Sequence, residues 1–283
     1  MTQQKRAITI QDISCVGRCS LTVALPILSA AGINTAILPT AILSTHTGGF
    51  TGYTFRDLTE DIDPICAHWQ ELDLATDALY TGYLGSQEQQ QQIARIFDDF
   101  NEGDPIILVD PAMADEGKLY PAFDAEFARG MSNLVAKATL TVPNITEAFF
   151  LLDKEYPASD YDQPWIEETL FELASLGPKQ VVLTGVSFEE GRLGAAALDT
   201  GQKTIEYYFT EKIPGYYHGT GDIYSSTLLA ALLNDKSLSE SIGIACEFTL
   251  GAIRRTAAAG TEPRYGVDFE HEIGHLLKML GRD

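Results

Sequence analysis

Short apolar runs alternate along the chain with segments whose apolar residues recur at helical spacing. The runs at 105–111 and 179–186 are apolar on both faces, which is typical of strands buried inside a parallel sheet. Further strands are predicted at 6–13, 34–43, 78–81 and 138–144, and a hairpin at 194–210 turns around Thr200 and Gly201. Helices are predicted at 19–32, 55–72, 86–100, 144–152, 163–177, 219–234 and 237–258, and in the last dozen residues. The alternation predicts an α/β fold with a central, mostly parallel β-sheet flanked by helices on both faces.

The organisation of the chain indicates one domain over residues 1–283. No proline-rich linker, repeat or low-complexity segment divides it, apart from four glutamines at 89–92 within a predicted helix. Pro64 lies inside the predicted helix 55–72, and we expect it to kink that helix or to start it afresh.

Charge and composition exclude several classes of function. The net charge of −21 argues against nucleic acid and anionic membranes as partners. No apolar run is long enough to span a bilayer, and the N-terminus lacks the apolar core of a signal peptide. The four cysteines are scattered and form no C-x-x-C, which favours free thiols in a reducing compartment. We therefore expect a cytoplasmic protein.

The segment HGTGD at 218–222 carries the most chemical information. Gly219, Thr220 and Gly221 precede an apolar helix, and backbone N–H groups at such a junction can bind an anion. Asp222 lies in the first turn, where a carboxylate either complements the helix dipole or acts as a base beside the anion site. The spacing alone leaves both interpretations open. The P-loop and dinucleotide glycine patterns are absent from the sequence.

Other polar residues follow predicted strands, where an open α/β sheet binds its ligands. Asn144 and Glu147 have the spacing of a capping box, and they are also suited to a hydrated Mg²⁺ beside phosphates; both roles can hold together. Asp110 follows a buried strand. Its carboxylate either faces a metal ion or nucleotide, or only helps to form a turn. His46 lies in a glycine-rich loop, 44–54, that could close over a small ligand.

Six segments in order resemble motifs of the pyridoxal kinase branch of the ribokinase-like superfamily, over nearly the whole chain. They are ITIQDISCVG, LSTHTGGFTG, TGYLGSQEQ, VDPAMAD, VPNITEAFFL and HGTGDIYSSTLLAALL. The resemblance implies phosphorylation of the 5′-hydroxymethyl group of a vitamin B6 vitamer by Mg-ATP. It also implies a homodimer and a use of K⁺ beside Mg²⁺.

The resemblance assigns a role to each matching residue. Asp222 would be the catalytic base, and Gly219, Thr220 and Gly221 the anion hole. Asp110, Asn144 and Glu147 would serve the phosphates and Mg²⁺, with Asp110 and Glu147 nearest the metal, and Thr184 would contact ATP. The vitamer would lie among Asp12, Thr47 and Tyr83, with His46 nearby.

One departure from the family pattern leaves an alternative open. Asp12 stands where pyridoxal kinases usually have Ser, and an acid there is closer to kinases of sugars and of hydroxymethylpyrimidine. A kinase of such a related alcohol is therefore the alternative. A non-catalytic vitamer-binding protein is disfavoured by the intact Asp222.

The segment HEIGH at 271–275 raises a different hypothesis, a zinc hydrolase. A catalytic zinc ion needs a third protein ligand, and none of the eight residues after His275 is His, Cys or Glu. Phe269, Ile273, Leu276, Leu277 and Leu280 instead form an apolar stripe. We expect HEIGH to be the partly exposed face of a packed C-terminal helix.

Overall fold

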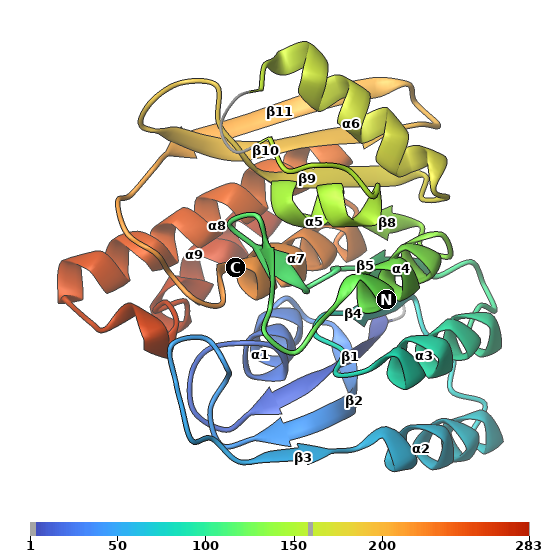
Figure 1. The fold of residues 1–283 in the computed structure, drawn as a ribbon. Coiled ribbons are helices and arrows are strands. Elements are labelled where there is room, and N and C mark those ends of the chain that lie inside the picture. Colours follow the sequence, from blue (N-terminus) through green and yellow to red (C-terminus); the bar gives the residue numbers. More distant parts are fainter. Residues whose placement is uncertain (1–3, 158–160, 283) are drawn as a thin grey trace.

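The computed structural model describes residues 4–157 and 161–282, which build a large twisted sheet between two layers of helices (Figure 1). The nine-stranded sheet has the order β11-β10-β9-β8-β5-β4-β1-β2-β3. Strands β9, β8, β5, β4, β1 and β2 run parallel, whereas β3 and β10 pair antiparallel with their neighbours. The strands are β1 Arg6–Ser14, β2 Asn34–Leu43, β3 Phe55–Asp57, β4 Ala78–Thr81, β5 Ile106–Val109, β8 Leu140–Thr141, β9 Gln180–Val186, β10 Arg192–Asp199 and β11 Thr204–Glu211. The predicted α/β class is confirmed.

Each face of the sheet is covered by its own set of helices. The first layer contains α2 Thr59–Glu71, α3 Gln87–Asp99, α4 Ala125–Val135, α5 Ile145–Leu151 and α6 Gln163–Ser175. The second contains α1 Leu21–Ala30, α7 Thr220–Leu233, α8 Leu238–Ala259 and α9 Ile273–Leu280. Two 3₁₀ turns, η1 Pro263–Tyr265 and η2 Glu270–Glu272, precede α9.

Strand β1 shows why the sequence adopts a sheet covered on both sides. Ile8 and Ile10 are fully buried under the first helix layer, whereas Ala7 faces the second layer. Successive side chains of a strand point to opposite faces, so a strand that is apolar throughout needs cover on both. Burial of one isoleucine side chain stabilises the fold by about 1.5–3 kcal/mol.

Some local predictions differ from the structure. Residues 55–57 form the edge strand β3 rather than the start of a helix, because they pair with Ala41–Leu43 of β2. Helix α2 then begins at Thr59 and continues through Pro64 without restarting. The carbonyl that loses its N–H partner to Pro64 belongs to the exposed Glu60, where water can replace the bond.

Two elements between 112 and 137 had no sequence prediction. They are α4 and a small hairpin of β6 Ala114–Asp115 with β7 Lys118–Leu119. Asp124 caps α4 by accepting hydrogen bonds from the N–H groups of Glu126 and Phe127.

The strand order places a crevice at the carboxyl ends of the parallel strands. Strand β1 lies between β2 and β4. After β1 the chain first builds the sheet on one side, with β2, and later on the other side, with β4. Ligands of open α/β sheets bind at such a switch point.

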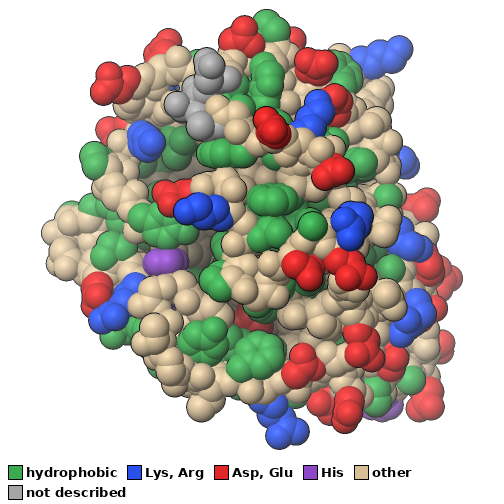
Figure 2. Space-filling model, in the orientation of Figure 1, with side chains coloured by type: hydrophobic (Ala, Val, Ile, Leu, Met, Phe, Trp, Pro, Cys, Tyr) green, Lys and Arg blue, Asp and Glu red, His purple; other side chains and the backbone are tan. Residues whose placement is uncertain are grey.

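Within the part of the chain that the structure describes, no helix is long and apolar enough to cross a membrane. Acidic side chains are scattered over the face seen in Figure 2, in keeping with the net charge of −21.

Candidate active site

A cavity of about 740 Å³ opens at the carboxyl ends of the parallel strands. All twelve residues predicted for the site line this one cavity, although they come from seven separate stretches of sequence. They are Asp12, His46, Thr47, Tyr83, Asp110, Asn144, Glu147, Thr184, Gly219, Thr220, Gly221 and Asp222. The predicted residues are therefore brought together.

The N-terminus of α7 faces the cavity and has no side-chain cap. Gly219 precedes the helix with φ of 76°, and a Cβ there would lie 1.9 Å from the Arg18 carbonyl oxygen. Only glycine fits this position, because any side chain meets both the backbone strain and the backbone clash. At Gly221 an added Cβ would meet no atom within 4 Å, so the first turn is open on the cavity side. The free N–H groups and the helix dipole form an anion-binding site.

Asp222 has the acid–base properties of a base poised near neutral pH. Burial raises the pKa of Asp222 to about 7, against hydrogen bonding from the Ser20 main chain, and the charges of Asp110 and Asp12 raise it further. A base works best when its pKa lies near the working pH. In this position Asp222 could act as a base beside the helix N-terminus as well as complement the helix dipole.

Asp110 and Glu147 form a buried acidic pair beside α7. Burial raises the pKa of Asp110 to about 6, although the Ser225 hydroxyl donates to its Oδ2 at 2.7 Å. Burial, and then the charge of Asp110, raise the pKa of Glu147 well above its ordinary value. The two carboxylates repel each other in the absence of a cation.

The capping box predicted for Asn144 and Glu147 is confirmed. Asn144 Oδ1 accepts from the Glu147 N–H at 2.9 Å, and Glu147 Oε2 accepts from the Asn144 N–H at 2.9 Å. Glu147 Oε1 accepts from the Met113 N–H at 3.1 Å. These bonds, with a further hydrogen bond from the Ala114 main chain, hold the carboxylate in one orientation.

The donor set of this pair fits Mg²⁺. Mg²⁺ prefers oxygen ligands, keeps several waters and needs only one or two protein carboxylates. A nearby cation would stabilise the ionised forms of Asp110 and Glu147, whose pKa values are raised chiefly by burial. No group of three or more His, Cys, Asp or Glu side chains is arranged around a metal position in residues 4–157 and 161–282.

Asp12 lies at the end of β1 and is held by two hydroxyl groups. Ser14 Oγ donates to Asp12 Oδ2 at 3.0 Å, and Ser20 Oγ donates to Oδ1. Ser20 has φ of 54° and ψ of −131°, a conformation that L-residues rarely adopt. Burial raises the pKa of Asp12, while the hydrogen bonds from Ser20 and then Ser14 lower it.

His46 is clamped by the backbone as a neutral ring. Its Nδ1 accepts from the Gly48 N–H at 3.1 Å, so the proton lies on Nε2, which donates to the Arg264 carbonyl at 2.6 Å. Burial lowers the pKa of His46 in agreement with this tautomer. The ring thereby ties the loop 44–54 to the turn η1.

A second histidine, missed by the sequence analysis, meets His46 across the cavity mouth. The ring centroids of His46 and His218 are 5.2 Å apart, and Tyr216 packs edge-on against His218 at 4.9 Å. Tyr216 donates its hydroxyl to Asp115 Oδ2 at 2.8 Å. The loop 44–54, the segment with Tyr216 and His218, and the β6–β7 hairpin with Asp115 therefore meet at one side of the cavity, and only the first of them is predicted as a lid.

Other lining residues were also missed. Ser20 and Ser225 hold acids of the site, Lys212 is the one Lys or Arg among the described lining residues, and Cys246 lies on α8. Ser225 could have been predicted as a site residue, because it lies three residues after Asp222 in the same predicted helix. The sequence offers no such signal for Ser20 or Lys212.

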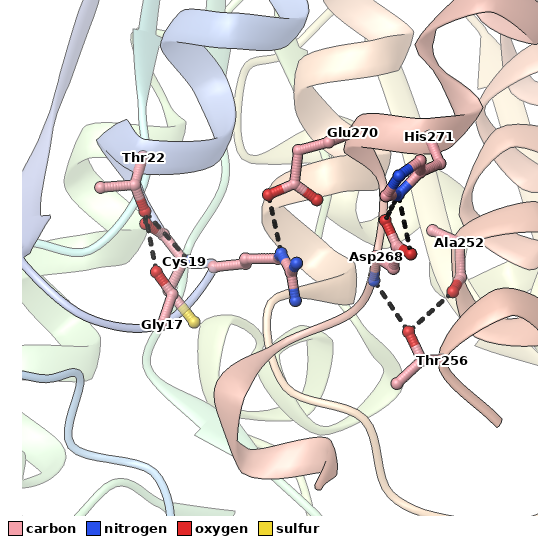
Figure 3. A network of polar contacts seen from close by, with 9 residues as sticks. Gly17, Cys19, Thr22, Ala252, Thr256, Asp268, Glu270 and His271 are labelled. Atoms are coloured by element: carbon pink, nitrogen blue, oxygen red, sulfur yellow. Dashed lines mark hydrogen bonds and ion pairs between the residues drawn. The ribbon is translucent and has the colours of Figure 1, made fainter. Parts of the chain in front are cut away.

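The HEIGH segment lies apart from this cavity. His271 lies in η2, before α9 begins, and its Nδ1 is 2.7 Å from Asp268 Oδ1 (Figure 3). Glu272 pairs with Arg255, and Phe269, Leu276 and Leu280 are buried as the predicted apolar stripe requires. The stripe is confirmed, but the predicted single helix is wrong at His271, because the chain there forms a 3₁₀ turn. The neighbouring Glu270 accepts a hydrogen bond from Arg18 Nε at 2.8 Å, which ties η2 to the segment before α1.

Comparison with known proteins identifies the family of the chain. The model of the family described as phosphomethylpyrimidine kinase matches residues 27–266. A solved structure named a "putative phosphomethylpyrimidine kinase" from Bacteroides thetaiotaomicron is 36% identical, with a TM-score of 0.94, and the match covers 97% of this chain and 94% of that one. A second crystal form named in the same way, with pyridoxal, has a TM-score of 0.93 and covers 97% and 96%.

Two further relatives are named as kinases of two different substrates, pyridoxal and hydroxymethylpyrimidine. The pyridoxal kinase structure from Lactobacillus plantarum is 30% identical, with a TM-score of 0.89 and coverage of 98% of both chains. The hydroxymethylpyrimidine/phosphomethylpyrimidine kinase of Bacillus subtilis is 24% identical over 225 residues, 78% of this chain and 79% of that protein. The chain has the ribokinase-like fold and belongs to the phosphomethylpyrimidine kinase family.

Proposed function

We propose that this protein transfers the γ-phosphoryl group of ATP to the 5′-hydroxymethyl group of a vitamin B6 vitamer. The observation that carries the proposal is the position of Asp222 in the first, uncapped turn of α7, inside the cavity that also holds Asp12, Thr47 and Tyr83. A base and an anion site on the same helix turn are what transfer to an alcohol requires.

The reaction follows from this arrangement. The substrate hydroxyl oxygen attacks the γ-phosphorus while ionised Asp222 accepts the hydroxyl proton. The bond between the γ-phosphorus and the β,γ-bridging oxygen breaks, and ADP leaves with that oxygen. The N–H groups of α7 then stabilise the charge on the transferring phosphoryl oxygens. Mg²⁺, when bound, neutralises phosphate charge, and Asp110 and Glu147 are the residues that would hold its hydration shell. Thr184 and Lys212 are proposed to contact the nucleotide at the far side of the cavity.

The relatives support this choice of substrate. The Lactobacillus plantarum protein is named a pyridoxal kinase, and the 36% identical Bacteroides protein was crystallised in a form with pyridoxal. Tyr83, whose pKa burial raises to about 12, remains a neutral donor at physiological pH and packs against Phe123 at 5.4 Å. We assign Asp12, His46, Thr47 and Tyr83 to the vitamer side.

Hydroxymethylpyrimidine phosphorylation is the second candidate. Asp12 and the names of the family and of the Bacillus subtilis relative favour it. Release of ADP from Mg-ATP, measured with pyridoxal, pyridoxine, pyridoxamine and hydroxymethylpyrimidine side by side, tests both candidates. Turnover of hydroxymethylpyrimidine alone would replace the main proposal with the second.

Several properties are proposed from the sequence and from its resemblance to the family. They are a single kinase domain over residues 1–283, a homodimer, K⁺ beside Mg²⁺, and a cytoplasmic location. Mass measurement in solution and activity with and without K⁺ test the dimer and the monovalent cation.

A further inference from the structure

The connection between α8 and α9 lies outside the cavity but reaches the residues that hold its anion site. We call residues 264–270 of this connection the strap; none of these residues, all of which the structure describes, lines the cavity. Val267 and Phe269 are buried in the core, and the Asp268 N–H donates to Thr256 Oγ1 of α8 at 2.8 Å (Figure 3). The strap is therefore fixed to α8 and to the core.

Arg18 joins the strap to the segment between β1 and α1. Its main-chain N–H donates to the Tyr265 carbonyl at 3.1 Å, and its Nε donates to Glu270 Oε1 at 2.8 Å. Because both side chains of the Arg18–Glu270 ion pair are partly exposed, the pair adds little to the overall stability of the protein. Arg18 is nevertheless held by the strap through both its main chain and its side chain.

The Arg18 main chain is in close contact with two glycines that both have positive φ. Gly219 precedes α7, and an added Cβ there would lie 1.9 Å from the Arg18 carbonyl oxygen. Gly266 belongs to the strap, and an added Cβ there would lie 2.6 Å from Arg18 Cβ and 2.8 Å from the same carbonyl oxygen. Non-bonded carbon atoms pack at about 3.5–4.0 Å, so neither glycine has room for a side chain. Three backbone segments, from the strap, Arg18 and the start of α7, are therefore closely packed together.

Ser20, two residues after Arg18, ties the same segment to the proposed base. Its main chain hydrogen-bonds Asp222, and its hydroxyl donates to Asp12 Oδ1. Its backbone, with φ of 54° and ψ of −131°, is in a rarely populated conformation that persists only where the surrounding structure fixes it. Close-packed protein interiors transmit strain, so a displacement of Arg18 is expected to move the first turn of α7 and Asp222.

We propose that the strap positions the anion-binding turn of α7 for phosphoryl transfer, with Gly266, Arg18 and Glu270 as positioning residues. The inference rests on the proposed function, because it assigns a task in that reaction to a segment outside the cavity. A misplacement of about 1 Å can lower the rate of an enzyme by about 10²-fold. The N–H groups of α7 act on charge that develops in the transition state, so their displacement should lower kcat without a comparable rise in either KM.

Two glycines of the same connection provide a matched test. Gly260 and Gly266 have φ of 62° and 80°, so alanine strains the backbone at both positions. An added Cβ meets no atom within 4 Å at Gly260, whereas at Gly266 it collides with Arg18. We expect kcat of Gly266→Ala to be about 10–100-fold below that of Gly260→Ala, with the KM values for ATP and the alcohol within about threefold. Equal kcat in the two variants, within about threefold, would overturn the inference.

The ion pair of Arg18 and Glu270 provides a second test. Arg18→Ala and Glu270→Ala should each lower kcat by about 10-fold, and the double variant should lower it no further, because all three remove the same interaction. Arg18→Lys keeps the charge and should restore kcat to within about threefold of wild type. Arg95→Ala, which breaks an exposed ion pair with Asp63 between α3 and α2, is the control and should leave kcat unchanged. A wild-type kcat in Arg18→Ala would overturn the roles of Arg18 and Glu270.

The failure of this inference can be distinguished from the failure of the proposed function. If the wild-type protein phosphorylates neither a vitamer nor hydroxymethylpyrimidine, the proposed function fails, and NMR of the ¹⁵N-labelled protein tests the inference without turnover. The amide shifts of Thr220 and Gly221 should move in Gly266→Ala and stay unchanged in Gly260→Ala. Unchanged shifts in both variants would overturn the inference. If Gly266→Ala does not fold, the same amide shifts and kcat are measured in Arg18→Ala with Arg95→Ala as the control, and the same criteria apply.

Discussion

Ser225 donates its hydroxyl to Asp110 at 2.7 Å, three residues beyond Asp222 on helix α7. The start of one helix therefore carries the proposed base and also holds the acid that follows β5. Burial raises the pKa of Asp110, Asp222 and Glu147, and repulsion from the charge of Asp110 adds to the rise in the pKa of Asp222 and of Glu147.

This repulsion predicts how stability depends on pH. The pKa of Asp222 is raised from 3.8 to about 7, so between these values the folded state binds more protons than the unfolded state. Stability contributed by protonated Asp222 is therefore present at low pH and is lost as pH rises toward about 7. Asp222→Asn should be more stable than wild type at pH 8 by about 1–3 kcal/mol, and less so at pH 5. Urea unfolding at both pH values measures this, and parallel pH curves for the two proteins would contradict it.

The same substitution should abolish the base. Asp222→Asn keeps the shape of the side chain but cannot accept the substrate proton, so kcat should fall by about 10²–10⁴-fold. Vitamer binding by calorimetry should survive. The wild-type rate should rise with pH through about 7, because the base must be ionised. A variant with near-normal kcat would show that another group takes the proton.

Two glycines of the anion site should respond differently to alanine. Gly219→Ala places a Cβ against the Arg18 carbonyl at positive φ and should destabilise the fold by at least about 1–3 kcal/mol. Gly221→Ala meets no atom within 4 Å and should fold normally. The added methyl group of Gly221→Ala enters the cavity and should displace the phosphates of ATP. We expect kcat/KM for ATP to fall by about 10–100-fold as a result. The melting temperatures and kinetics of both variants distinguish the structural role of Gly219 from the phosphate-binding role of Gly221. A fully active Gly221→Ala would show that the phosphates do not bind at this turn.

Two capping boxes in the described part of the chain provide a matched pair. Glu147 caps α5 inside the cavity, and Glu240 makes the same reciprocal bonds with Ser237 at the exposed start of α8. Gln still supports a capping box, so Glu147→Gln and Glu240→Gln should both fold. Only Glu147→Gln should raise the Mg²⁺ concentration needed for half-maximal activity, by about 10–100-fold. An equal Mg²⁺ requirement in both variants would limit Glu147 to its structural role.

Much of the site could be predicted because its residues lie at strand ends and helix starts, where local spacing carries the signal. Asn144 and Glu147 were predicted both as a cap and as site residues because they are three apart at the start of a helix. Ser20 could not be found in this way, because its contacts with Asp12 and Asp222 exist only after β1, α1 and α7 have packed together.

The elements of the fold also divide into those with a local sequence signal and those that depend on contacts with distant segments. The sequence pattern predicts the strands that are apolar on both faces, whereas it predicts helix at β3, whose strand character depends on pairing with β2. The glutamine run was noted only for its composition. In the structure Gln89 and Gln90 are buried, and their amides donate to carbonyls of Thr40 and Phe127 in other elements. Such long-range polar contacts leave no periodic trace in a sequence.

The central claim is that the hydroxymethyl group of a B6 vitamer receives the phosphoryl group. The most direct measurement is kcat/KM for pyridoxal, pyridoxine, pyridoxamine and hydroxymethylpyrimidine with Mg-ATP, with mass spectrometry of each product and Asp222→Asn as the inactive control. We predict a vitamer 5′-phosphate as the product of highest kcat/KM, formed together with one ADP. No phosphorylated vitamer, or a higher kcat/KM for hydroxymethylpyrimidine than for every vitamer, would contradict the account.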